Sequence, residues 1–195
     1  MNVQSHMTSR TSMRRDPPRR PVKQRIIWAP VASALVLVGP AVLAVVTGQV
    51  FLFPSLGPTA VMLAHEPQHH SSRPYAVLVS HAVGFLAASV SVAIFGVAFA
   101  PSVFETHTVS LARACAAVLA LALAVFLEVV LHAEHPPAAA TTLLVALGSF
   151  QPTLYSAFLI MSGVVVVLAI GEPLRRVRLK LEARLDDPDA SSQIV

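Results

Sequence analysis

The sequence predicts an all-α integral membrane protein with four long transmembrane helices and two short proline-initiated helices, arranged as two repeats. Hydrophobic residues make up 55% of the chain and charged residues only 12%, which is far from the composition of a soluble globular domain. Four apolar stretches are each long enough to cross a bilayer. Basic residues gather in the two terminal segments, as they do on the cytoplasmic flanks of membrane helices.

The apolar stretches fall into two length classes. Two shorter stretches, residues 55–64 and 136–150, have prolines near their starts and are too short to cross as ordinary helices. The others are close to or above the ~20 residues that a spanning helix needs. These long stretches occupy residues 26–53, 75–100, 111–131 and 153–171.

The start of a short helix inside a membrane has a specific chemistry. It leaves four backbone N–H groups with a partial positive charge, and such a start attracts anions. At membrane depth these groups need protein partners or a polar cavity. Proline suits the first turn because it has no N–H to leave unsatisfied. The residues predicted to bind an anion or line its path are Gly57, Pro58, Thr59, His135, Pro136, Pro137, Thr141 and Thr142.

An internal repeat is indicated by the order of the elements. A long helix, a short helix, a polar connection and a long helix occur twice, and a shift of 79 residues lays Pro58 on Pro137 and Gly84 on Gly163. Many transporters are built from two such units. If the short helices re-enter and return on one face, there are four crossings and the units run parallel. If they cross, there are six crossings and the units are inverted.

The domain organisation follows from these patterns. The first segment is rich in proline, arginine and serine and lacks the apolar core of a secretory signal, so we expect a disordered basic tail. A transmembrane domain follows, and the last segment is basic and then acidic. The boundaries are residues 1–25, 26–172 and 173–195, and within the membrane domain the repeats cover residues 26–100 and 111–171.

Charge predicts the orientation of the chain. Of its 14 lysines and arginines, 7 precede Ile26 and 5 follow Gly171, so both termini are expected in the cytoplasm. We expect a multi-pass protein of the bacterial plasma (inner) membrane, with the lipid bilayer as a partner. The high isoelectric point comes from the terminal segments, so no nucleic-acid partner is expected.

Three short motifs indicate a family. "GPTAVML" follows the first long stretch, Ser80 and His81 lie inside the second, and "HPP" occupies residues 135–137 before a run of alanines. Together they resemble the HPP family of small integral membrane proteins over residues 28–171. The resemblance implies four transmembrane helices. It also implies transport of a small inorganic anion, because plant plastid and cyanobacterial members are associated with nitrite transport. Members commonly have Gly-His where this chain has Ser80-His81.

Three ionisable side chains are candidates for the chemistry. His135 precedes Pro136, which keeps it out of the α region, and its ring could hold an anion or shuttle a proton. Its alternative role is to cap the helix. His81 and Glu128 lie within long apolar stretches and are candidates for proton coupling. Alternatively, His81 is neutral and hydrogen-bonded between helices, and Glu128 reaches toward the membrane interface.

A histidine-rich segment raises the question of a metal site. "HEPQHHSSRP", with "HAEH" further along the chain, supplies ligand types that zinc accepts. However, Pro67 breaks any helical face, and the adjacent His69 and His70 point in different directions, so we predict no metal site. No phosphate loop, zinc helix or nucleophile elbow occurs, and we therefore expect neither an enzyme nor a cofactor.

Two functions from different classes remain. The first is a transporter or channel for a small inorganic anion such as nitrite, held at the buried N-termini of the short helices. The second is a non-transporting membrane sensor or assembly module whose polar residues only satisfy helix packing. A chain of 195 residues is small for a transporter, which favours a homo-oligomer. An anion-uptake assay separates the two functions.

Overall fold

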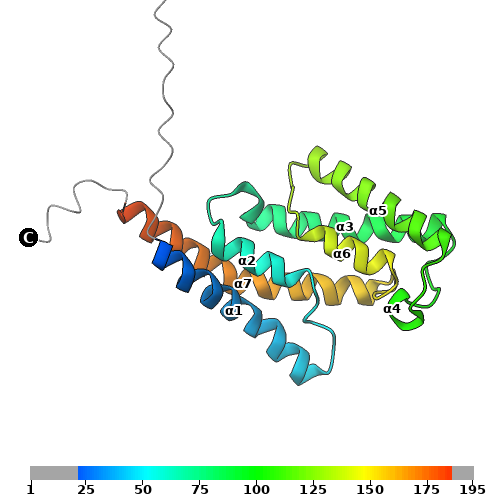
Figure 1. The fold of residues 1–195 in the computed structure, drawn as a ribbon, viewed down its shortest axis with the longest axis horizontal. Coiled ribbons are helices and arrows are strands. Elements are labelled where there is room, and N and C mark those ends of the chain that lie inside the picture. The colour runs from blue at the N-terminus through cyan, green and yellow to red at the C-terminus, as the bar shows by residue number, and fades with distance from the viewer. Residues whose placement is uncertain (1–21, 186–195) are drawn as a thin grey trace, which may run out of the picture.

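Helices make up the regular structure of the computed structural model, which describes residues 22–185. That range contains no β-strand, so the prediction of an all-α protein is confirmed there. Figure 1 shows the arrangement. The elements are α1 (Val22–Thr47), α2 (Leu56–His65), the 3₁₀ helix η1 (His70–Ser72), α3 (Pro74–Ile94), α4 (Val103–Thr106), α5 (Leu111–Val130), α6 (Ala138–Ala146) and α7 (Leu154–Leu185).

Four of these helices are long and apolar enough to cross a membrane, which confirms the four predicted long helices. Their spanning segments are Ile26–Thr47, Pro74–Ile94, Leu111–Val130 and Leu154–Arg184. Many large apolar side chains of these helices are exposed on the outside of the molecule. Such a surface is costly in water and suits contact with lipid tails.

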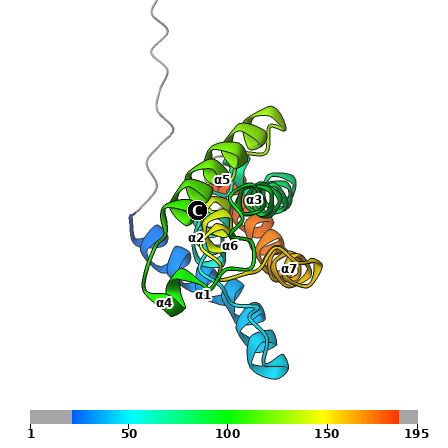
Figure 2. The ribbon, with the colours of Figure 1, turned by 90° about the vertical axis from the view of Figure 1, so that its right-hand side faces the viewer.

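The two short helices lie in the middle of the bundle. Viewed along the long axis, α2 and α6 are surrounded by α1, α3, α5 and α7 (Figure 2). They begin near each other and run toward opposite ends of the molecule (Figure 1). Just beyond the end of α2, Gln68 donates to Glu182 of α7 at 3.0 Å. At the other end of the molecule, the last residue of α6, Ala146, accepts from Arg113 in the first turn of α5.

Four helices end at residues that differ clearly from the sequence prediction. α1 ends at Thr47 and α3 at Ile94, short of the predicted residues 53 and 100. α6 has nine residues and ends at Ala146, short of the predicted end at residue 150, and Gly148 turns the chain there with a φ of 89°. α7 continues through Pro173 to Leu185. The segment from residue 173 to 185, which the sequence analysis assigned to a C-terminal tail, is therefore helical. The predicted disordered tail falls on residues 1–25, of which 1–21 lie outside the described residues.

Ion pairs between successive turns stabilise the added length of α7. Glu172 accepts from Arg175 at 2.6 Å and from Arg176 at 2.7 Å. Further along, Arg178 and Glu182 form a buried pair at 2.8 Å. Pairs at these spacings bring opposite charges together on one helix face. The charges in this part of α7 therefore pair along a continuous helix.

Two glycines let the short-helix regions pack tightly on the long helices. A Cβ at Gly84 of α3 would meet Thr142 Oγ1 and lie 3.3 Å from the carbonyl oxygen of Ala138 in α6. A Cβ at Gly163 of α7 would lie 3.1 Å from the carbonyl oxygen of Phe51, in the segment leading to α2. Interiors packed this closely have no room for an added methyl group.

Replacing Gly84 by alanine is therefore expected to lower the thermal unfolding temperature of the purified protein. Overpacking of this kind costs about 1–3 kcal/mol, which exceeds the gain of about 1 kcal/mol from alanine's better helix propensity. Gly57→Ala is the matched control, because a Cβ there would meet nothing within 4 Å. Equal unfolding temperatures for the two variants would contradict the close approach of α3 and α6.

A buried cation that the sequence analysis did not single out holds the end of α6. Arg113 donates to the carbonyl oxygens of Ala100 at 2.8 Å, Pro101 at 3.1 Å and Ala146 at 3.2 Å. The carbonyls at a helix C-terminus carry a partial negative charge that attracts a cation. The guanidinium is thus engaged by backbone carbonyls at one end of the molecule.

Candidate functional site

Polar side chains that are distant in the sequence meet where the two short helices begin. Ser55 immediately precedes α2 and Thr59 lies in its first turn, while His81 comes from α3. His135 lies in the turn before α6, and Thr141 lies within α6. All five side chains are fully buried, with 0% of their surface exposed. We call these five residues the central cluster.

Hydrogen bonds connect the whole cluster. The hydroxyls of Ser55 and Thr141 lie 2.7 Å apart, and Thr141 Oγ1 lies 2.8 Å from His81 Nδ1. Thr59 Oγ1 lies between the two rings, 3.4 Å from His81 Nε2 and 3.0 Å from His135 Nε2. The ring centroids of the two histidines are 5.5 Å apart. The cluster therefore joins residues from both short helices and from α3.

One end of the cluster fixes the protonation pattern of His135. Its Nδ1 lies 2.7 Å from the carbonyl oxygen of Ser71 in η1. A carbonyl oxygen can only accept a hydrogen bond, so Nδ1 carries the proton. In the neutral ring Nε2 is then an acceptor, and the hydroxyl of Thr59 must donate to it.

The other bonds follow in one direction. If both rings are neutral, His81 Nε2 donates to Thr59 and His81 Nδ1 accepts from Thr141, whose hydroxyl accepts in turn from Ser55. Each hydroxyl and each ring then donates once, and no donor in the cluster is left without an acceptor. This matters because an unsatisfied polar group buried away from water is costly.

Thr59 has a second acceptor within reach. Its hydroxyl lies 2.9 Å from the carbonyl oxygen of Ser55, one turn earlier. The single hydroxyl proton can serve either this carbonyl or His135 Nε2, but not both at once. The Thr59 hydroxyl can therefore change its acceptor while every other donor of the cluster keeps its own.

Glu128 supports the turn that carries His135. It lies in the last part of α5 and is 6% exposed. The backbone amide of His135 lies close to the Glu128 carboxyl group. The side chain thus faces the backbone of the turn rather than the imidazole ring.

The amide groups at the start of α6 are engaged locally. The N–H groups of the first three residues of α6 donate to the carbonyl oxygens of His135, Pro136 and Pro137, at 2.9 to 3.1 Å. In this conformation these N–H groups therefore already have hydrogen-bond acceptors, which is what an anion would otherwise supply. The polar groups nearest the two helix starts are the side chains of the central cluster.

The remaining predicted site residues are placed outside the cluster. Thr142 is buried but donates to the carbonyl oxygen of Ala138 at 3.2 Å, one turn earlier. Pro58, Pro136 and Pro137 line an apolar groove of about 560 Å³ between α2 and α6. Gly57 is partly exposed beside open space.

The histidine-rich turns lie at the end of the molecule where α2 and α5 finish. His70 Nε2 lies 3.0 Å from the carbonyl oxygen of His132 and 3.8 Å from the carboxylate of Glu134. Within residues 22–185, no three histidine, cysteine, aspartate or glutamate side chains come close enough together to hold a metal ion.

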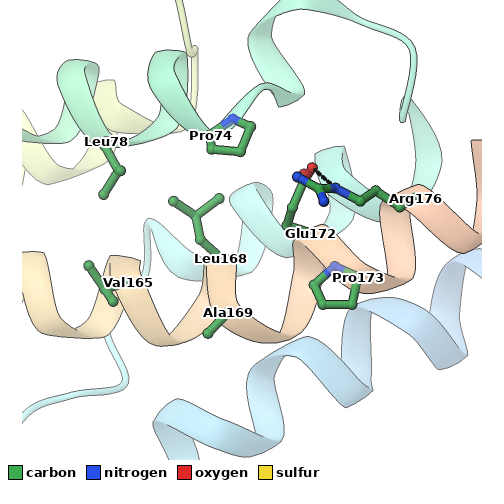
Figure 3. A pocket seen from close by; sticks show the side chains of 8 residues that line it. All are labelled: Pro74, Leu78, Val165, Leu168, Ala169, Glu172, Pro173 and Arg176. Atoms are coloured by element: carbon green, nitrogen blue, oxygen red, sulfur yellow. Dashed lines mark hydrogen bonds and ion pairs between the residues drawn. The ribbon is translucent and has the colours of Figure 1, made fainter.

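A second groove lies between α3 and α7. Its floor is apolar, with Leu78, Val165 and Leu168 among the side chains that line it, and its volume is about 530 Å³. Figure 3 shows the ion pair between Glu172 and Arg176 at one end of this groove. No residue of the central cluster lines it, so the groove and the cluster are separate features.

The pattern of the whole membrane domain matches a known family. The model of the family described as "HPP, transmembrane region" matches residues 18–180. The chain belongs to the HPP transmembrane family. The resemblance predicted from the three sequence motifs is therefore confirmed. Neither the curated proteins nor the solved structures gave a match to this HPP protein.

Two residues that take part in the central cluster or contact it were not predicted. Ser55 directly precedes the "LGPT" segment, and Ser71 lies in the histidine-rich segment that was considered for metal binding. Ser71 contributes its backbone carbonyl oxygen, which accepts from His135. A backbone group of this kind cannot be recognised from the sequence. Serine is favoured immediately before a helix as a cap, but the Ser55 hydroxyl contacts Thr141 and does not cap α2, so its role carried no sequence signal either.

Proposed function

We propose that this HPP-family protein carries a small inorganic anion, with nitrite as the leading candidate, across the membrane through the central cluster. The observation that carries the proposal is the connected set of three hydroxyls and two histidines buried between spanning helices. Polar and ionisable groups inside a membrane are expensive and mark ion pathways. No covalent chemistry and no cofactor enter this proposal.

We infer an inverted repeat, and such a repeat would favour a path through the middle of the bundle. Gly84 of α3 packs on α6, and Gly163, its counterpart at a shift of 79 residues, packs beside the start of α2. The two short helices also run in opposite directions from the cluster (Figure 1). We propose two inverted units and six passes, with both basic ends in the cytoplasm of a bacterial cell.

The described conformation is closed, since every side chain of the cluster is fully buried. Transport therefore requires one unit to move against the other, so that the cluster opens to each side in turn. In an opened cluster, the hydroxyls and ring N–H groups are donors that a small anion can accept from. A small planar anion with several acceptor atoms matches this set of donors.

An uptake assay tests the proposal. Purified protein in liposomes is expected to take up nitrite faster than protein-free liposomes of the same lipid, and nitrate, formate and chloride serve as comparison anions. Folded protein is verified by its gel-filtration profile before and after reconstitution. Failure to take up any of the four anions would contradict transport and favour the non-transporting sensor or assembly module.

A further inference from the structure

No arginine or lysine in residues 22–185 forms a hydrogen bond with a side chain of the central cluster. Among the described residues, Arg113 is engaged by three carbonyls at the far end of α6. The two arginines of α7 that pair with Glu172 are engaged by its carboxylate, and Arg175 also donates to the carbonyl oxygen of Pro67 at 2.7 Å. A charge without a counter-charge in a low-dielectric interior costs several kcal/mol. An anion that enters the cluster therefore needs a positive charge that arrives with it.

Only the two histidines of the cluster can take up a proton, and they differ in how easily their surroundings adapt. When His135 Nε2 is protonated, it donates to Thr59, whose hydroxyl turns to the carbonyl oxygen of Ser55 at 2.9 Å. Thr59 then accepts from both rings through its two lone pairs. Every donor in the cluster still has an acceptor after this single rotation.

Protonation of His81 has no such solution. A proton on its Nδ1 would face the Thr141 hydroxyl, which would have to turn away toward Ser55. The Ser55 and Thr141 hydroxyls would then face each other with two protons but only one acceptor between them, so one proton would have no acceptor within the cluster. Leaving a buried donor unsatisfied costs about 1–3 kcal/mol, or roughly 5-fold to 150-fold in occupancy. The hydrogen-bond geometry therefore favours His135 Nε2 as the proton acceptor.

We propose that the protein moves one proton with each monovalent anion, with the proton held at His135 Nε2 and the Thr59 hydroxyl switching between His135 and the Ser55 carbonyl. This inference rests on the proposed transport function and specifies its coupling. The N–H bond formed on one side breaks on the other, and the proton and the anion leave together. The complete step carries no net charge across the membrane.

Of the titratable side chains near His135 named below, only His81 belongs to the central cluster. His81 of α3 lies within the cluster, and the carboxyl group of Glu128 in α5 lies close to the backbone amide of His135. His132 and Glu134 lie in the same turn as His135, and His70 of η1 contacts that turn. The neighbouring parts of three other helices contain no titratable side chain. These parts are residues 26–47 of α1, 56–64 of α2 and 158–171 of α7. α6 contains none either.

Proton movement and charge movement can be measured in the same liposomes. Valinomycin and potassium set the membrane potential, and a pH-sensitive dye inside reports protons during nitrite uptake. Protein-free liposomes give the background from nitrous acid that crosses the lipid by itself. We expect one proton to enter per nitrite above this background, and the final nitrite accumulation to be unchanged when the membrane potential is changed.

The alternative outcomes separate the two proposals. Uptake of the bare anion would change the accumulation ratio about 50-fold per 100 mV, because an elementary charge crosses the potential. Nitrite uptake that requires the protein, follows the membrane potential in this way and brings no proton would overturn the proton coupling. It would still support anion transport. Absence of uptake of nitrite, nitrate, formate and chloride above background would instead overturn transport itself.

Discussion

Replacement of His135 by alanine is expected to reduce protein-dependent nitrite uptake at least about tenfold, because a hydrogen bond to a charged group contributes about 1.5–3 kcal/mol. The substitution removes the ring that contacts both Thr59 and the Ser71 carbonyl. It also removes the group that we propose to balance the charge of the anion. Initial rates of uptake into liposomes, at matched protein content, measure the effect.

The matched control is His65→Ala, which removes a histidine at the end of α2, outside the central cluster. We expect the control to transport nitrite at close to the normal rate. Thermal unfolding of both variants shows whether the His135 variant still folds. A folded His135→Ala protein that transports nitrite as fast as His65→Ala would remove His135 from the pathway.

Substituting valine for Thr59 is expected to abolish most nitrite uptake while preserving the shape of the site. Valine replaces the hydroxyl by a methyl group, so both His81 and His135 lose their shared partner. Two buried ring nitrogens then lack a hydrogen bond, at a cost of about 1–3 kcal/mol each. A rise of about 1.4 kcal/mol in the barrier to transport lowers the rate tenfold, so we expect at least a tenfold fall. The liposome uptake assay measures this fall.

Thr59→Ser provides the comparison that separates the hydroxyl from the rest of the side chain. It keeps the oxygen and deletes the methyl group, so uptake should recover relative to Thr59→Val. If both variants show the same low rate and both fold, then packing of the Thr59 methyl group matters and the hydroxyl does not. That result would contradict the role of the switching hydrogen bond.

The spanning helices could be predicted from the sequence because a membrane helix needs only length and hydrophobicity. The stretches at 75–100 and 111–131 begin within a residue of α3 and α5 as observed. The far end of α7 could not be predicted in the same way. Its stability depends on which charges pair along the helix, such as Glu172 with Arg175, and hydropathy carries no information on pairing.

The site was predicted in its parts but not in its connections. Thr59, His81 and His135 were each recognised as polar residues in an apolar setting, since such residues stand out in the sequence. Their common contact depends on the two short helices beginning side by side, which is a property of tertiary packing. The contribution of Ser55 and the local use of the α6 amides likewise depend on distances that the sequence does not contain.

Histidine nitrogen NMR in lipid bilayers tests most directly whether the anion binds at the central cluster. The chain has 8 histidines, and the two in the cluster can be assigned through single substitutions. Our account predicts that His135 is protonated at Nδ1 alone without anion, and that nitrite at mildly acidic pH shifts the signals of His81 and His135 selectively. Unchanged signals from both rings at saturating nitrite, in protein that transports it, would contradict the account.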